Sequence, residues 1–205
     1  MNTERYNFAV VSGRCRRQVL VYIGRRRCSP RWQIARAAFR FPGSLRTYDD
    51  CLAQVTDAHA LARASLWAAT AEQASGQAFN YVHPPFRWRR VWEKVAKHFG
   101  LEVGEPIPFA LATHMPALEP VWQATAGVLV KTDFSKAVGW GFGDFIFGTE
   151  ADVISDMTKI RLAGFSEDLD AVDALIRAIE RQQAGRVIPL STGAERALGR
   201  RGLPK

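Results

Sequence analysis

Residues 139–165 read GWGFGDFIFGTEADVISDMTKIRLAGF, and the rest of the chain is organised around this stretch. Five aromatic residues mark it: Trp140, Phe142, Phe145, Phe147 and Phe165. Glycines alternate with the first of these residues, and this spacing predicts a turn that exposes alternate aromatic side chains. Such side chains either pack in the protein core or line an apolar ligand pocket, and the spacing leaves both interpretations open.

The second half of the stretch predicts a helix. Thr149-Glu150-Ala151-Asp152 has the spacing of a capping box, with Asp in place of Glu. Basic residues at 159 and 161 suit the last turn, because they face the negative end of the helix dipole. Gly164 then ends the predicted helix.

The triplet Gly139-x-Gly141-x-Gly143 is not a dinucleotide-binding fingerprint. That fingerprint needs GxGxxG between an apolar strand and a helix, because the backbone N–H groups must approach the pyrophosphate. Here Trp140 and Phe142 occupy the intervening positions, and their rings would fill the space that a phosphate needs.

Composition predicts one globular domain. The chain has 205 residues, of which 47% are hydrophobic, enough to bury a sizeable core. The sequence has no run of 18 apolar residues, and its first residues lack the apolar core of a secretory signal, so we expect no membrane association. Three cysteines without a CxxC pair favour a reducing compartment, the cytoplasm.

The positive charge lies at the two ends of the chain. Residues 1–40 carry ten arginines against one glutamate, and residues 191–205 carry four basic residues against one glutamate. The net charge is +8, so residues 41–190 are mildly acidic. We interpret residues 1–40 as an atypical Arg-rich segment, either a poorly packed arm or a phosphate-binding arm, and residues 191–205 as a basic disordered tail.

Helices dominate the predicted domain at residues 41–190. One helix begins near Thr56 or Asp57, ends near Thr70, and is so rich in alanine that we expect most of its faces to be buried. Residues 87–99 give the clearest helix, with one apolar stripe and a terminating Gly100; its basic face we expect to be solvated. Ser166 is expected to cap the last helix, which ends at Gly185.

Strands are expected to be few and short. The segments FAVV, QVLVYIG, QAFNYV and RVIPL are the candidates. Prolines between residues 104 and 120 exclude a long helix there, and Pro120 suits the start of another that reaches residue 130. The fold class is therefore α/β, mostly helical with a few short strands.

Titratable residues give no clear catalytic pattern. The four histidines, at positions 59, 83, 98 and 114, have no metal-ligand spacing, so we expect no metal site. Asp152 and Asp156 would share one face of the predicted helix, but an acidic residue in a first turn is expected for structural reasons alone.

Several segments together resemble one enzyme family. VTDAHALARASLWAAT (55–70), GQAFN (76–80), FRWRRVWEKVAKHFGLE (86–102), GFGDFIFG (141–148), DVISDMTKIRLAGF (152–165) and RVIP (186–189) are similar, in order and spacing, to the C-terminal part of the progesterone 5β-reductase/iridoid synthase-like (PRISE-like) enzymes. These are atypical extended short-chain dehydrogenases/reductases (SDRs). The resemblance covers about residues 41–189.

The resemblance implies a Rossmann half that binds NADP(H) and a mostly helical C-terminal part that covers the substrate. Such enzymes pass a hydride from NADPH to an activated enone, while a tyrosine and a lysine stabilise the enolate oxygen. It also implies that Phe142 lines the pocket for a small apolar carbonyl or enone substrate. With the neighbours Trp140, Phe145 and Ile146, it forms the predicted substrate-binding set.

The chain departs from the family in its first part. A Rossmann half needs about 150 residues, and only residues 1–40 precede the resemblance; they contain neither the glycine fingerprint nor the family's tyrosine–lysine pair. We therefore expect a substrate-binding part with the Rossmann half largely missing, truncated and inactive alone, which self-associates or docks onto a Rossmann partner. The alternative is a non-catalytic module whose basic arm binds nucleic acid or an acidic partner.

Overall fold

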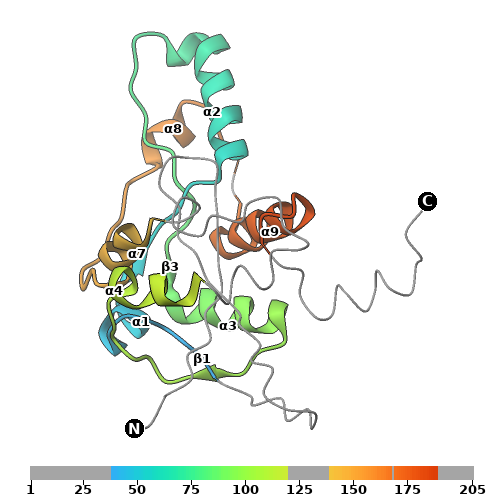
Figure 1. Ribbon diagram of the computed structural model, residues 1–205. Coiled ribbons are helices and arrows are strands. Elements are labelled where there is room, and N and C mark those ends of the chain that lie inside the picture. The colour runs from blue at the N-terminus through green and yellow to red at the C-terminus, as the bar shows by residue number, and fades with distance from the viewer. Residues whose placement is uncertain (1–37, 120–138, 168, 189–205) are drawn as a thin grey trace, which may run out of the picture.

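The computed structural model describes residues 38–119, 139–167 and 169–188 (Figure 1). Helices dominate the described residues and the strands are short, which confirms the expected fold class. The elements are β1 (Phe39–Arg40), α1 (Leu45–Asp49), β2 (Leu52–Ala53), α2 (Ala58–Thr70), the 3-10 turn η1 (Glu72–Ala74), β3 (Phe86–Arg87), α3 (Trp88–Phe99), β4 (Val103–Gly104), α4 (Leu111–His114), the 3-10 turn η2 (Met115–Leu118), α7 (Trp140–Phe147), α8 (Thr158–Leu162) and α9 (Ala171–Ala184).

Several expectations fall outside the described residues. They are the strands FAVV and QVLVYIG, nearly all of the Arg-rich segment at residues 1–40, the helix from Pro120, and the tail at residues 191–205. The described part of RVIPL, residues 186–188, forms no strand.

The strands form two separate pairs of two residues each. β1 pairs with β4 in parallel, with Phe39 opposite Val103. β2 pairs with β3 antiparallel, with Leu52 opposite Arg87. The predicted strand QAFNYV is wrong, since residues 77–82 are irregular and are held beside the start of α2 mainly through side chains, such as the Thr56 hydroxyl that donates to the Tyr81 carbonyl at 3.1 Å.

Helix α3 confirms the predicted apolar stripe. Its buried residues are Trp88, Val91, Trp92, Val95, Ala96 and Phe99, the same six residues that define the stripe. Gly100 ends the helix with a φ of 67°, in the left-handed region that glycine adopts without strain.

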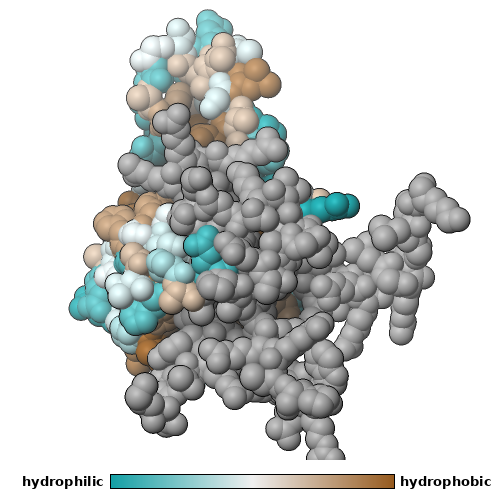
Figure 2. Space-filling view, in the orientation of Figure 1, coloured by the Kyte–Doolittle hydropathy of each residue, from teal (hydrophilic) through white to brown (hydrophobic). Residues whose placement is uncertain are grey.

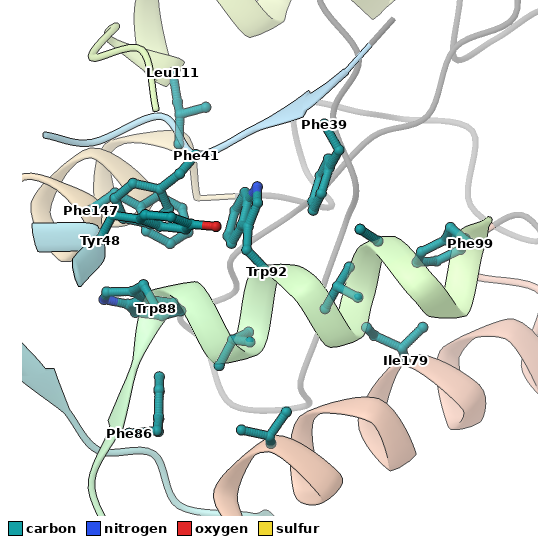
Figure 3. Packing of buried hydrophobic residues seen from close by; sticks show 14 of the residues in the cluster. Phe39, Phe41, Tyr48, Phe86, Trp88, Trp92, Phe99, Leu111, Phe147 and Ile179 are labelled. Carbon is teal, nitrogen blue, oxygen red and sulfur yellow. The ribbon is translucent and has the colours of Figure 1, made fainter. Parts of the chain in front are cut away.

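The main core extends along the whole of α3, and its aromatic rings gather mostly around the first half of this helix (Figure 3). Phe41 lies at its centre: its ring meets Trp92 edge-on at 5.1 Å and Phe147 edge-on at 5.3 Å. Phe39 stacks on Trp92, with the two ring centroids 4.7 Å apart. Edge-to-face and stacked ring pairs of this kind stabilise the fold beyond the contribution from burying their apolar surface. The ring of Phe147 fixes α7 to this core.

Helix α2 lies where the sequence predicts it, but its surroundings differ from the prediction. Asp57 caps it, since one carboxylate oxygen accepts from the N–H groups of His59 and Ala60. Only Ala60 and Ala64 are buried, and Leu66 is 66% exposed. The expectation of a helix buried on most faces is therefore wrong. Figure 2 shows apolar residues among polar ones on the surface at the top of the view, where Figure 1 places α2.

A second, smaller core joins α2 to α8. Its buried members are Ala60, Ala64, Tyr81, Met157, Ile160 and Phe165. We call this part of the molecule the α2 lobe. Leu66 on α2 and Leu162 on α8 lie outside this core, with Leu162 83% exposed.

The helix predicted from the capping box at residue 149 is much shorter than expected. Residues 149–157 are irregular because they bond to a distant segment. Asp152 Oδ1 accepts from the N–H of Leu52 at 2.8 Å, and the Val153 N–H donates to the Leu52 carbonyl at 2.9 Å. Only α8 remains helical, and the Gly164 φ of 105° ends the turn after it, as predicted.

The last helix, α9, begins later than predicted. Asp170, not Ser166, caps it, because its Oδ1 accepts from the N–H groups of Val172 and Asp173. Val172 and Ile179 are fully buried against α3, and Gly185 ends the helix as expected.

Candidate functional site

Helix α7 carries the residues of the predicted substrate wall. The expectation of a turn is wrong, since residues 140–147 form two turns of helix. The helical period directs Trp140, Gly143 and Phe147 into the protein, where all three are buried. Phe142 and Phe145, three residues apart, lie on the outer face.

The structure brings only part of the predicted set together. The rings of Phe142 and Phe145 stack at a centroid distance of 6.4 Å and an interplanar angle of 25°, and Phe145 is 70% exposed. Trp140 is 7% exposed and belongs to the main core, while Ile146 is half-buried and packs against that core. Of the four predicted residues, Phe142 and Phe145 therefore form the accessible aromatic pair, and the substrate-binding role stays a prediction.

A groove of about 470 Å³ runs along another side of α7. Its walls are mostly apolar side chains and backbone, with the carboxylates of Asp144 and Glu150 as its charged groups. The lining residues are Pro42, Gly43, Ser44, Pro108, Phe109, Ala110, Leu111, Asp144, Phe147, Gly148 and Glu150. None of the four predicted residues lines this groove.

Asp144 fixes α7 against α4. Its two carboxylate oxygens accept from the backbone N–H groups of Leu111 at 2.5 Å and Ala112 at 3.0 Å. These N–H groups have no partner within their own helix, because they lie in its first turn. A side chain of one helix thus caps another, and the outer aromatic pair of α7 is held on a fixed base. The sequence gives no signal for this contact, since Asp144 stands alone among aromatic residues.

The glycine triplet does not fit a phosphate cradle. Gly141 and Gly143 are both helical residues of α7, and the Gly143 N–H donates to the Gly139 carbonyl at 3.2 Å within this helix. A side-chain carbon at Gly143 would lie 2.7 Å from Leu111 Cδ1, so the space beside this glycine is filled by an apolar side chain. The space beside Gly143 is therefore not open to a phosphate group.

The described residues contain no group of three or more His, Cys, Asp or Glu side chains placed to hold a metal ion. His83 is 1% exposed, and its Nε2 accepts from the Asp57 N–H at 3.0 Å, which positions the start of α2. Asp156 binds within its own turn, where it accepts from the N–H and hydroxyl of Thr158. None of the helices in the described ranges combines the length and the apolar character that crossing a bilayer requires.

Comparison with known proteins places the chain near plant enzymes. An (S)-8-oxocitronellyl enol synthase from Camptotheca acuminata is 28% identical over 157 residues, which are 73% of this chain and 40% of that enzyme. One from Nepeta racemosa is 30% identical over 162 residues, 75% of this chain and 40% of the enzyme. A 3-oxo-Delta(4,5)-steroid 5-beta-reductase from Arabidopsis thaliana is 28% identical over 155 residues, 73% of this chain and 39% of the enzyme.

No family model matches the chain. The chain spans about 40% of the length of the curated relatives. The relatives nevertheless include both kinds of enzyme that give the resembled family its name, a 5-beta-reductase and the enol synthases. The resemblance is confirmed: over about 74% of its length, the chain is related to the PRISE-like enzymes.

Proposed function

We propose that this chain supplies the substrate-binding part of an NAD(P)H-dependent oxidoreductase of the PRISE-like kind, for a small apolar carbonyl or enone substrate. Its relatives support the class of reaction, since one of them is named as a reductase of 3-oxo-Delta(4,5)-steroids. The observation that carries the proposal is the Phe142–Phe145 pair, which presents stacked rings on the outer face of a helix anchored to the core.

The aromatic pair has an energetic reason to bind an apolar partner. Phe145 leaves 70% of its surface in water. Full burial of a side chain of this size is worth roughly 1.5–3 kcal/mol, so a ligand that covers it gains a substantial part of that energy. The two flat rings suit the flat conjugated system of an enone, which can stack on them.

Binding of a 3-oxo-Δ4-steroid to the purified chain tests this proposal, with intrinsic tryptophan fluorescence as the readout. Phe145→Ala should weaken binding at least tenfold, about 1.4 kcal/mol. Leu162→Ala is the matched control, because it removes a comparably exposed apolar side chain from α8 and should leave binding unchanged. Equal binding by both variants would contradict the assignment of the aromatic pair.

We propose further that NADP(H) is held by a Rossmann portion outside the described residues, and that this chain is inactive alone. The filled space at Gly143 supports this, since the glycine triplet offers no cradle for a pyrophosphate. Titration of the chain with NADPH, followed by nucleotide fluorescence, should show no saturable binding. A micromolar dissociation constant would refute the cofactor part of the proposal and leave the aromatic pair untouched.

The exposed leucines on the α2 lobe support the proposal that the chain associates with a partner. Leu61, Leu66 and Leu162 are 45%, 66% and 83% exposed on the α2 lobe. We propose that a Rossmann portion, of the kind that the family carries, packs over these leucines, because about 60% of the relatives' length lies outside the match. Without that cover the chain should self-associate and bind a hydrophobic dye. A monomer by light scattering that binds no dye would speak against this.

We also propose that the protein works in a reducing compartment such as the cytoplasm. Cys51, the cysteine that the structure describes, is buried and free. All three cysteines should therefore react with iodoacetamide after denaturation without reductant; protection of any pair would oppose the proposal.

A further inference from the structure

A second hollow, of about 340 Å³, lies between the start of α2 and α9, away from α7. Figure 1 shows α9 beneath the lower end of α2. Its lining residues are Asp57, His59, Arg63, Leu169, Arg177 and Arg181. One pair of residues from each helix faces the hollow: His59 and Arg63 on α2, and Arg177 and Arg181 on α9. Each pair has i, i+4 spacing, which places both of its side chains on one helix face.

The carboxylates at this hollow are already engaged. The carboxylate of Asp57 caps α2 with one oxygen and accepts from Arg181 at 2.6 Å with the other. Burial alone would raise the pKa of Asp57, but the hydrogen bonds from Ala60 and Arg181 outweigh it and hold the pKa below its usual value. Beside the hollow, Glu167 takes a two-pronged contact from Arg63, whose Nε lies 2.8 Å from both carboxylate oxygens.

The cations outnumber these carboxylates. Among the residues that the structure describes, three guanidinium groups meet two carboxylates here, which leaves one positive charge unbalanced. The surplus group is Arg177, which forms no ion pair with any carboxylate that the structure describes. It is exposed and lies one turn before Arg181 on α9. The positive end of the α2 dipole lies at the same place.

We infer that this hollow binds the phosphate group of a small molecule, with Arg177 as its main contact. A guanidinium presents parallel N–H donors that match two phosphate oxygens. Arg63 and Arg181 border the same space and keep further N–H donors beyond those that their carboxylates use. One guanidinium is enough to bind both oxygens of a carboxylate, as Arg63 does with Glu167, whereas a tetrahedral phosphate can accept hydrogen bonds from several guanidinium groups.

The size of the hollow favours a phosphate monoester over free phosphate. A water molecule takes about 30 Å³ of liquid, so 340 Å³ leaves room for an organic body beside the phosphate. Leu169 is the apolar side chain in the lining and would contact that body. This assignment is independent of the proposed substrate wall on α7.

Calorimetric titration of the full chain at low ionic strength tests the inference. Inorganic phosphate, glycerol 3-phosphate and succinate are the three probes, and sodium chloride matches the ionic strength. Both phosphates should bind saturably and succinate should not. Tighter binding of glycerol 3-phosphate than of phosphate identifies the monoester as the source.

Arg177→Gln should weaken phosphate binding about tenfold. Arg177→Lys should bind phosphate with an affinity between those of the wild type and Arg177→Gln, because lysine keeps the charge but loses the paired N–H donors of the guanidinium. Arg46→Gln is the matched control: it removes the same charge from an exposed position on α1 and should change binding less than twofold. Circular dichroism should show that all variants fold, since both arginines are exposed. Absence of saturable phosphate binding, equal binding of succinate, or equal effects of Arg177→Gln and Arg46→Gln would each overturn the inference.

Discussion

Gly43→Ala should destabilise the protein, because the space beside this buried glycine is occupied by fixed atoms. Gly43 lies between β1 and α1 and faces the last turn of α7. An added side-chain carbon would overlap the carbonyl oxygen of Phe147 and lie 2.5 Å from Phe41 Cε1. Carbon atoms normally approach to about 3.5–4.0 Å, and neither neighbour is the free end of a flexible chain. Phe41 is fully buried between other rings.

The expected loss follows from overpacking. Extra carbon atoms in a packed core cost about 1–3 kcal/mol, and a backbone clash places Gly43→Ala near the upper end of that range. The lower entropy of the unfolded alanine chain offsets about 0.4–1 kcal/mol. The net loss is then about 2 kcal/mol, which moves a urea midpoint down by about 1 M at an m value of about 2 kcal/mol/M.

Gly141→Ala is the matched control. Gly141 lies within α7, and an added carbon there meets nothing within 4 Å. Gly141 is the second residue of α7, and replacing a helical glycine with alanine should stabilise by up to about 0.5–1 kcal/mol. Urea unfolding followed by tryptophan fluorescence compares the two variants, whose free energies of unfolding should differ by about 2–3 kcal/mol. A Gly43→Ala midpoint at or above that of the wild type would refute the packing of α7 against this loop.

Three further predictions concern titration and capping. Burial raises the pKa of Tyr48 to about 12, so between pH 10.0 and about 12 the hydroxyl keeps its proton in the folded state and loses it in the unfolded chain. The free energy of unfolding should therefore fall by roughly 2–3 kcal/mol as the pH rises through this window. Urea midpoints measured across the window should show this fall, and Tyr48→Phe should abolish it. The Asp57 pKa lies below 3.8, so its contribution is present above pH 3.8 and lost as pH falls through the folded pKa; Asp57→Asn should flatten that acid limb, and an unchanged limb would count against it. Asp144→Ala should cost about 1–2 kcal/mol and speed amide exchange at Leu111 and Ala112, whereas unchanged exchange would show that the cap contributes nothing.

Local patterns in the sequence predicted the elements that depend on local chemistry. The period of α3 and the glycine at its end suffice to predict that helix and its buried face. The cap at Asp57 likewise predicted where α2 begins. The environment of α2 could not be predicted this way, because an alanine-rich helix fits either a buried or a solvent-exposed position. Leu66 in fact lies on the solvent-exposed side of the helix.

Contacts between distant residues account for the errors. Glycine lowers helix propensity, so residues 139–147 favoured a turn, but the burial of Phe147 and the cap from Asp144 stabilise α7. The helix expected from residue 149 is lost because Asp152 and Val153 bond to Leu52. No periodicity within the segment reports a partner about a hundred positions away.

The candidate sites show the same division. Helical spacing does place Phe142 beside Phe145, but the family resemblance was needed to single them out. It also placed Trp140 in the set, although this side chain belongs to the core. The hollow with Arg177 was missed, since its residues come from α2 and α9, and the i, i+4 arginine pair on α9 was the available signal.

The small core of the α2 lobe bears on how the molecule opens. Two of the six buried residues of that core, Ala60 and Ala64, are alanines, which bury little area, whereas α3 buries two tryptophans and a phenylalanine. Individual polar contacts connect the lobe to the rest of the molecule, such as the hydrogen bond from the Ser155 N–H to the Gln54 side chain and the ion pair between Asp57 and Arg181. We therefore expect the two cores to unfold as separate cooperative units, so that the lobe can unfold while the rings around Phe41 stay packed. Amides of α2 should then exchange through a partial opening, and the exposed leucines of the α2 lobe lie on this less stable unit.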